Sequence, residues 1–337
     1  MRLDELGEFG LIARLSGDGG TRPDVLLGVG DDAAVLEFGG ESLLVATVDA
    51  QVEGRHFLRG VATPEEIGHK ALAVNLSDIA AMGAEPLWAL ISLFVPPDLA
   101  VEVLDGVYAG FKGLAGRFGV ALVGGNVAAT DGPLAIDVTL LGRAARGRVL
   151  TRAGGQPGDL LLVTGTLGAA AAGMLSLSSD SRLASLAREV LMRARQAQVV
   201  PQPRVDEGRA LAATDVVHAM IDASDGLAAD VRHLCERSGV GAELEALSIP
   251  VDPAAVAVAT ALRHDPLELA LTGGEDYELL FSVRPGDEAQ ALNALREVGG
   301  SAHLIGRLTV EPGLRLRHAD GREVALAPRG WDHLASS

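Results

Sequence analysis

The first 145 residues alternate between strand-like and helix-like patterns of apolar and polar residues. Short apolar runs between turn residues predict strands over 25–29, 34–38, 42–48, 87–95, 120–123 and 134–141. Helical spacing of apolar residues predicts helices over 64–82 and 99–118, with Pro64 near the start of the first one. Strands that alternate with helices in this way are typical of an α/β sheet protein.

A similar alternation follows in the second half. Residues 143–158 are rich in Arg and Gly, and we expect a domain boundary within this stretch. Strands are predicted over 160–164, 217–222, 277–283 and 302–308, and helices directly after Gly168 and over 183–195, 227–238 and 287–298. The stretch 201–213 starts with prolines and then becomes helical. The sequence therefore predicts an α/β (α+β) protein with an N-terminal domain, residues 1–145, and a C-terminal α/β domain, residues 146–337.

The chain of 337 residues carries 28 basic and 45 acidic residues, which gives a formal net charge of −17. This excess of acid argues against binding to nucleic acid, which requires a basic face, and against an anionic membrane surface. A single cysteine, Cys235, excludes an intrachain disulfide and a cysteine-based zinc site. The N-terminus lacks the pattern of a signal peptide, and no apolar run is long enough to span a bilayer. We therefore expect a cytoplasmic protein without nucleic-acid or membrane partners.

Acidic residues recur beside glycines and at the ends of predicted strands, and this pattern is more specific than net charge. The acidic segments are 28–32, 47–49, 75–78, 222–226 and 273–276, and four of the five follow apolar strands or a helix. Short loops at strand ends can direct side chains from one rigid sheet toward one place. Asp carboxylates there suit Mg²⁺, a hard cation that also binds substrate phosphates. One such segment alone is an ordinary turn, but five together favour a metal site.

Two familiar phosphate-binding motifs do not account for this chain. Residues 28–33 match a dinucleotide fingerprint, with Asp49 near the position of the usual ribose-binding acid. However, Asp31 and Asp32 would repel a pyrophosphate, and a predicted strand follows where that motif requires a helix. A P-loop is absent because neither lysine of the chain precedes Ser or Thr. Divalent cations on clustered Asp residues are therefore the predicted means of binding nucleotide phosphates.

Several of these segments resemble the thiamine-monophosphate kinases. They are GVGDD at 28–32, the run over 70–84, DASDG at 222–226, GGEDYE at 273–278 and GWDH from residue 330. The resemblance extends over nearly the whole chain, from 7–9 to 330–332. It implies membership of the superfamily of aminoimidazole ribonucleotide synthetase, whose fold combines an N-terminal mixed sheet and helices with a C-terminal α/β domain.

The resemblance also implies an activity. In that family, ATP donates its γ-phosphoryl group directly to the phosphate of thiamine phosphate, with several Mg²⁺ ions, and the enzyme is a homodimer. The N-terminal domain would bind ATP and metal and form the dimer. The implied metal-binding residues are Asp32, Thr47, Asp49, Asp78, Asn126, Asp222 and Asp225. The implied ATP contacts are Gly125, Asn126, Arg152 and Ser224, and the implied substrate contacts are His56, Glu275 and Trp331.

One residue departs from the family pattern and keeps a noncatalytic function open. Asn126 stands where the family has Asp, so one metal site has lost a charge that Asp131 or Asp137 nearby would have to replace. Val48 stands where Thr is frequent, and only its backbone carbonyl could bind metal. The loss of the Asp at residue 126 keeps a noncatalytic sensor of nucleotide or thiamine phosphate as an alternative. A different ATP-dependent synthetase of the same superfamily is a second alternative.

Overall fold

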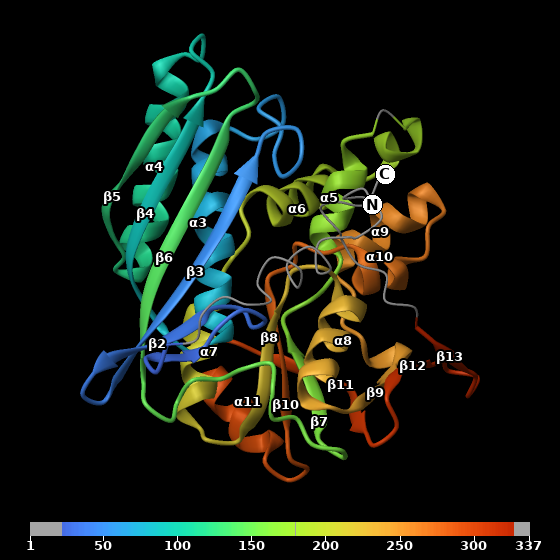
Figure 1. Ribbon diagram of the computed structural model, residues 1–337. Helices are drawn as coiled ribbons and strands as arrows, with labels where there is room; N and C mark the ends of the chain where they lie inside the picture. Colours follow the sequence, from blue (N-terminus) through green and yellow to red (C-terminus); the bar gives the residue numbers. More distant parts are fainter. Residues whose placement is uncertain (1–21, 179, 327–337) are drawn as a thin grey trace, which may run out of the picture.

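The strands of the N-terminal half form one mixed sheet. A computed structural model describes residues 22–178 and 180–326, and Figure 1 shows its arrangement. The strands of this sheet are β1 (Val25–Leu27), β2 (Ala34–Gly39), β3 (Ser42–Val52), β4 (Glu85–Val95), β5 (Ala121–Ala129) and β6 (Ala135–Ala145). Their order is β1-β2-β3-β6-β4-β5, in which β4 and β5 are parallel and the other neighbours antiparallel. Helices α3 (Pro64–Ala81) and α4 (Val101–Phe118) cover one face of the sheet.

Helix α3 begins at a capping box and is buried on almost every side. The Thr63 hydroxyl accepts a hydrogen bond from the Glu66 amide at 3.3 Å, and the Glu66 carboxylate accepts one from the Thr63 amide at 2.8 Å. These reciprocal bonds satisfy backbone groups at the helix N-terminus. The N-terminal sheet and α4 pack on one side of α3, and α7 (Val205–Ala213) and β8 (Val217–Ala223) pack on the other. Side chains on α3, including Lys70 and Asp78, therefore extend from a rigid element.

The C-terminal half builds a second mixed sheet. Its strands are β7 (Leu160–Thr164), β8, β9 (Gly241–Glu245), β10 (Glu278–Val283), β11 (Ala302–Thr309), β12 (Gly313–Arg317) and β13 (Glu323–Ala325), in the order β13-β12-β9-β11-β7-β10-β8. Its helices are α5 (Ala169–Ser176), α6 (Arg188–Val199), α7, α8 (Leu227–Ser238), α9 (Pro253–Leu262), α10 (Pro266–Thr272) and α11 (Glu288–Glu297), with short 3-10 turns η1 (Ser181–Ser185) and η2 (Ala246–Ser248).

One hydrophobic core runs through both halves. It joins Leu72 and Leu76 of α3 to Ile136 of β6 on one side and to Phe281 of β10 on the other. A second apolar cluster lies on the opposite face of the C-terminal sheet beneath α8, and a third joins α5, α6 and α9. The shared core holds the two sheets together, which matters for a site whose residues come from both.

The two mixed sheets with their helices confirm the predicted α/β (α+β) fold class. The strand Ala34–Gly39 also confirms that no helix follows the glycine motif at 28–33. The prediction of a single helix over 183–195 is wrong. Two elements, η1 and α6, occupy this stretch, and Leu186 between them is extended. The Asp180 carboxylate accepts a hydrogen bond from the Arg182 amide at 2.9 Å and so starts η1 as a separate turn.

Several strands are longer than predicted, among them β6, which continues from the predicted end at Leu141 to Ala145. Strand β3 continues from the predicted end at Val48 to Val52, because it pairs with β6 along its whole length. Strand β5 continues to Ala129, because it pairs with β4. Within the described residues, no helix combines the length and the apolar composition that crossing a membrane requires.

Candidate active site

A cavity of about 840 Å³ lies between the two halves of the chain, and acidic residues from both halves line it. All five acidic segments of the sequence contribute to its walls. They supply Asp31 and Asp32, Thr47 to Asp49, Asp78, Asp222 with Ser224 and Asp225, and Gly273 with Glu275. Segments that are distant in the sequence therefore meet in one place, although Asp78 lies in α3 and residues 47–49 lie within β3 rather than at a strand end.

Three carboxylates form the centre of this acidic lining. Asp32 precedes β2, Asp78 lies in the last turns of α3, and Asp222 lies at the end of β8. One oxygen of each lies within 4.8 Å of the others. The Thr47 hydroxyl donates to Asp78 at 2.5 Å, and the Ser77 hydroxyl donates to Asp222 at 2.6 Å. The second oxygen of Asp32 is buried and has no hydrogen-bond partner among the residues that the structure describes.

The electrostatics of the cluster favour a bound cation. Burial, with the charge on Asp32, raises the pKa of Asp222 to about 8. Burial, with the charges on Asp49 and Asp222, raises the pKa of Asp78 well above its ordinary value. A divalent cation favours the ionised forms and can bind the Asp32 oxygen that lacks a protein partner. The donor set therefore fits a hard cation such as Mg²⁺.

Arg152 and Ser224, the two predicted ATP contacts in the C-terminal half, lie beside this cluster. The Arg152 guanidinium donates to Asp32 at 2.6 Å, and the Arg152 amide donates to both carboxylate oxygens of Asp31 at 3.2 Å. The Ser224 hydroxyl donates to Asp222 at 3.3 Å. A guanidinium can bind phosphate oxygens with the donors that remain. The site thus offers cation positions and a fixed positive charge to a phosphate group.

His56 and Glu275, two of the predicted substrate contacts, line the same cavity. The His56 ring accepts a hydrogen bond from the Val52 amide at 2.9 Å. Glu275 has a left-handed backbone with φ 59°, and its amide donates to the Ser224 carbonyl at 2.7 Å. Between them lies Lys70, whose ammonium group is 2.6 Å from the Glu275 carboxylate and donates to the His56 carbonyl at 3.1 Å. Lys70 begins the run over 70–84, but the sequence pattern favoured a structural role for it on the predicted helix rather than a place in the site.

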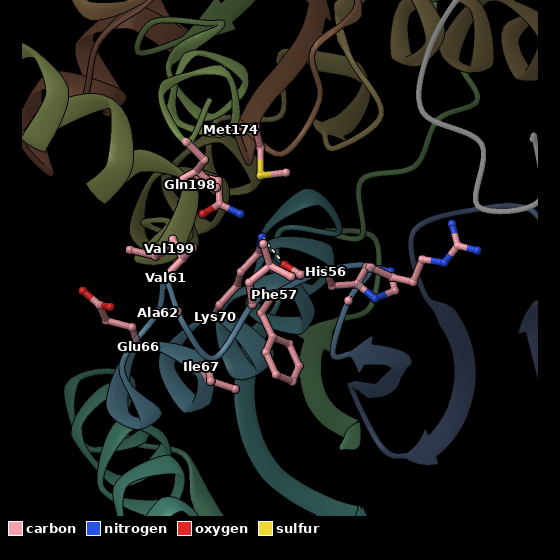
Figure 2. Close-up of a pocket in the computed structure, with 14 residues that line it drawn as sticks. His56, Phe57, Val61, Ala62, Glu66, Ile67, Lys70, Met174, Gln198 and Val199 are labelled. Atoms are coloured by element: carbon pink, nitrogen blue, oxygen red, sulfur yellow. Dashed lines mark hydrogen bonds between the residues drawn. The ribbon is translucent and has the colours of Figure 1, made fainter. Parts of the chain in front are cut away.

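A smaller cavity of about 80 Å³ adjoins the large one and shares His56, Met174 and Gln198 with it. Figure 2 shows this smaller cavity, with Met174 and Gln198 on one side and Phe57 and Ile67 on the other. Most of its walls are apolar and come from Phe57, Val61, Ala62, Ile67, Leu177 and Val199. The large cavity therefore gives the site a charged region, and the small cavity gives it an apolar region.

Gly125 and Asn126 are not brought to this cavity. Among the residues that the structure describes, neither lines it. They lie in β5, which is three strand spacings from β3, or about 14 Å at about 4.8 Å per spacing. Gly125 has a packing reason of its own, because a Cβ atom there would lie 1.8 Å from the Ile91 carbonyl oxygen. Asn126 of β5 and Asp137 of β6 both pair with Ser92 of β4. Strand β4 therefore lies between Asn126 and the Asp137 carboxylate.

The third predicted substrate contact, Trp331, lies outside the described residues. Two residues that sequence reasoning missed, Asp230 of α8 and Tyr277, line the large cavity. Asp230 is buried, and one of its oxygens accepts a hydrogen bond from the Asp225 amide at 3.4 Å. Burial, with the charge on Asp225, raises the pKa of Asp230 well above its ordinary value. No motif marks Asp230, because its position depends on how α8 packs.

Comparison with known proteins agrees with this geometry. A family model described as AIR synthase related protein, N-terminal domain, matches residues 30–144, and the model of the corresponding C-terminal domain matches residues 156–319. Thiamine-monophosphate kinase of Escherichia coli strain K12 is 37% identical over 335 residues, covering 98% of this chain and 99% of the relative. The enzyme of the same name from Aquifex aeolicus is 35% identical and covers 99% of this chain and 100% of the relative.

Solved structures share the fold over its full length. A structure described as AaThiL complexed with AMPPCP and TMP matches with a TM-score of 0.85 and 34% identity, covering 99% of both chains. A hydrogenase maturation protein from E. coli matches with a TM-score of 0.69 at 23% identity, covering 96% of this chain and 99% of the other, and shares the fold alone. The chain therefore belongs to the AIR synthase-related family. Within that family, it belongs with the thiamine-monophosphate kinases.

Proposed function

We propose that the large cavity is the active site in which the chain transfers the γ-phosphoryl group of ATP to thiamine phosphate. The products are thiamine diphosphate and ADP. The observation that carries this proposal is the convergence of Asp32, Asp78 and Asp222 with the Arg152 guanidinium. Membership of the thiamine-monophosphate kinase family and the likeness to a structure with AMPPCP and TMP support the choice of substrates.

Asp32, Asp78 and Asp222 would hold Mg²⁺, and Thr47, Asp49 and Asp225, which line the same cavity, would complete the coordination of several ions. When bound, the cations supply positive charge that offsets the repulsion between two phosphorylated substrates. The protein must keep the carboxylates ionised and their side chains fixed. The hydrogen bonds from Thr47 to Asp78 and from Ser77 to Asp222 serve this purpose.

The chain's own residues then align the two substrates. In the reaction, an oxygen of the acceptor phosphate forms a bond to the γ-phosphorus while the bond to the β,γ-bridging oxygen of ATP breaks. A phosphate oxygen is already a competent nucleophile, so the site needs no general base, and positioning and charge provide the catalysis. Arg152 and Ser224 would bind the nucleotide phosphates beside the acidic cluster.

The acceptor would lie on the side of the cavity where His56 and Glu275 stand. The apolar cavity next to His56 suits the uncharged part of a heterocyclic acceptor. Glu275 can face the cationic thiazolium ring, and Trp331 would complete the acceptor site by stacking on a ring. This arrangement places the phosphate end of the acceptor toward the acidic cluster.

A homodimer is the second part of the proposal. On the N-terminal sheet, Ala89, Ile91 and Leu93 of β4 face the helices and are buried, whereas Leu90 and Phe94 on the other face are 39% and 41% exposed. Val48 of β3 adds to this exposed apolar face and also lines the cavity. A second copy packed here would cover these side chains. Gly125 and Asn126 would then lie near the interface, and any contact they make with ATP or metal would require the second copy.

The proposal includes the two-domain division at residues 145 and 146 and a cytoplasmic location. The strands of the first sheet end at Ala145, and those of the second begin at Leu160. The single cysteine, Cys235, is buried and free, which suits a reducing compartment.

One assay tests the proposed reaction. The purified protein is incubated with ATP, Mg²⁺ and thiamine phosphate, and thiamine diphosphate and ADP are measured by chromatography. We expect equal amounts of both products. ADP formed only with a different acceptor would instead favour a synthetase of the same superfamily, and tight binding of thiamine phosphate without turnover would favour a sensor.

A further inference from the structure

A buried lysine connects the two residues that we assign to the acceptor. Lys70 of α3 is 2% exposed. Its ammonium group lies 2.6 Å from the Glu275 carboxylate and donates to the His56 carbonyl at 3.1 Å. Figure 2 shows the Lys70 side chain running to the His56 backbone at the edge of the small cavity. The phosphoryl transfer described above requires no charge at this place, so the buried ammonium needs another explanation.

The cost of burying Lys70 shows that its contacts are specific. A buried ammonium is unfavourable unless a carboxylate and hydrogen bonds compensate for the lost water. The neighbouring residues Ala71, Leu72 and Ala73 are apolar and buried, so the core itself needs no charge at this position. The chain has two lysines and otherwise uses Arg. A lysine side chain carries a compact charge at the end of a narrow aliphatic chain, so it can extend between packed elements.

The contacts of Lys70 join two halves of the site. His56 lies in the segment between β3 and α3 of the N-terminal half, and Glu275 lies between α10 and β10 of the C-terminal half. Glu275 also holds a left-handed backbone, which costs free energy that other contacts must offset. Because α3 is rigid, one ammonium group on it can fix both segments.

Lys70 is separate from the nucleotide and metal side of the site. Within the described part of the chain, it lines the small cavity but not the large one, and the two contacts given above do not include Asp32, Asp78 or Asp222. We propose that Lys70 is a positioning residue for the acceptor, which holds His56 and Glu275 where thiamine phosphate binds. This inference rests on the proposed function.

Steady-state kinetics of Lys70→Met test the inference. Loss of a hydrogen-bonded charge should raise the KM for thiamine phosphate at least about tenfold. The KM for ATP and the Mg²⁺ concentration for half-maximal rate should change by less than about twofold, because Lys70 does not touch that side. Lys112→Met on α4 is the matched control, since Lys112 is exposed and should leave every constant unchanged.

A purely structural role would give a different result. The fraction of active enzyme and the Tm would fall, and kcat would fall with them while both KM values stayed the same. That outcome would overturn the inference and leave the proposed function intact. If Lys70→Met does not fold, Lys70→Arg provides the test. Arginine keeps the charge, but its guanidinium has no single nitrogen that can contact both Glu275 and the His56 carbonyl in the same way. A raised KM for thiamine phosphate alone supports the inference, and unchanged constants contradict it. Absence of thiamine diphosphate with the wild-type protein would instead refute the proposed function itself.

Discussion

The carboxylates of Asp32, Asp78 and Asp222 lie close together. If all three were ionised, they would repel one another unless a positive charge compensated for their negative charges. Their nearest oxygens are within 4.8 Å of one another, and Thr47 and Ser77 each donate one hydrogen bond to the group. Like charges in a buried site raise the pKa of the carboxyl groups, and a bound divalent cation opposes this effect. At the scale of single residues, metal binding and protonation are therefore linked.

The raised pKa of Asp222 predicts that the metal-free protein loses stability as pH rises. An Asp in the unfolded chain has a pKa of about 3.9, whereas burial and the charge on Asp32 raise the folded value to about 8. Between these values the folded protein binds more protons than the unfolded protein, so the free energy of unfolding falls with increasing pH. We expect the Tm in EDTA to fall as pH rises through this window, and to fall less in Asp222→Asn.

The comparison with the variant is essential, because burial also raises the pKa of Asp31 to about 6 and that of Asp276 to about 8. Asp320→Asn is the matched control. Asp320 is exposed, and it lies in the turn before β13. It should keep the wild-type dependence on pH. If Asp222→Asn showed the same dependence as the wild type, Asp222 would not be the titrating group.

Asn126→Asp restores the carboxylate that the family pattern has at this position. We expect the Mg²⁺ concentration for half-maximal rate to fall, because Asp is a stronger ligand for a hard cation than Asn. A titration of the initial rate with Mg²⁺ measures the effect. Asn293→Asp on the exposed side of α11 is the control and should change nothing. An unchanged or higher requirement for Mg²⁺ in Asn126→Asp would contradict a role for this position in metal binding.

At the scale of elements, α3 is the part on which the site depends most. It carries Lys70, Ser77 and Asp78 and packs against both sheets. Its contact with α4 is close, because a Cβ atom at Gly68 would lie 1.9 Å from the Val107 carbonyl oxygen. A small displacement of α3 would therefore move metal-binding and acceptor-binding groups together.

Gly68→Ala should push α3 and α4 apart. We expect it to lower the free energy of unfolding by about 1–3 kcal/mol, as overpacking of a core does, and to lower the Tm accordingly. Gly113→Ala in α4 is the matched control, because among the described residues no atom outside the adjoining backbone of α4 lies within 4 Å of a Cβ atom there. The better helix propensity of Ala should leave that variant as stable as the wild type or more stable by up to about 1 kcal/mol. Equal stability of the two variants would show that the α3–α4 contact can relax.

Prediction from sequence succeeded where local signals are strong. Helix α8 spans the predicted residues 227–238, and α3 differs from its prediction by one residue, because caps and apolar spacing mark both. The helix predicted over 183–195 was wrong, because the extended backbone at Leu186 separates η1 from α6. Short elements such as α10 depend on packing with distant segments and leave little local pattern.

For the whole molecule, the sequence predicted which acidic segments would meet but not how they are supported. Motif residues such as Asp32 and Asp222 can be found because they lie beside glycines and at strand ends. Asp230 could not be found, because its contact with Asp225 depends on how the chain packs. Lys70 begins the run over 70–84, but only its contact with Glu275, which depends on the same packing, distinguishes it from a structural helix residue. The position of Asn126, three strands from β3, likewise follows from sheet order, which the sequence pattern did not reveal.

The exposed face of the N-terminal sheet predicts the oligomeric state. We expect light scattering after size exclusion to give twice the 34.7 kDa of one chain. Phe94→Glu should shift the protein toward the monomer, because a charge on the apolar face opposes its burial. Leu247→Glu is the control, since Leu247 is 83% exposed in η2 and outside that face. A wild-type monomer, or a Phe94→Glu dimer as stable as the wild type, would contradict packing through this face.

The most direct test of the central claim is thiamine diphosphate formation by Asp78→Asn over a range of Mg²⁺ concentrations. Asp78 lies in the acidic cluster, and its loss removes a charge from the proposed cation site while its hydrogen bond with Thr47 can persist. At a Mg²⁺ concentration that saturates the wild type, we expect the rate to fall at least about a hundredfold, with an unchanged Tm or a higher one. Asp320→Asn should retain the wild-type rate. A wild-type rate in Asp78→Asn at the same Mg²⁺ concentration would contradict the assignment of this cluster as the metal site for phosphoryl transfer.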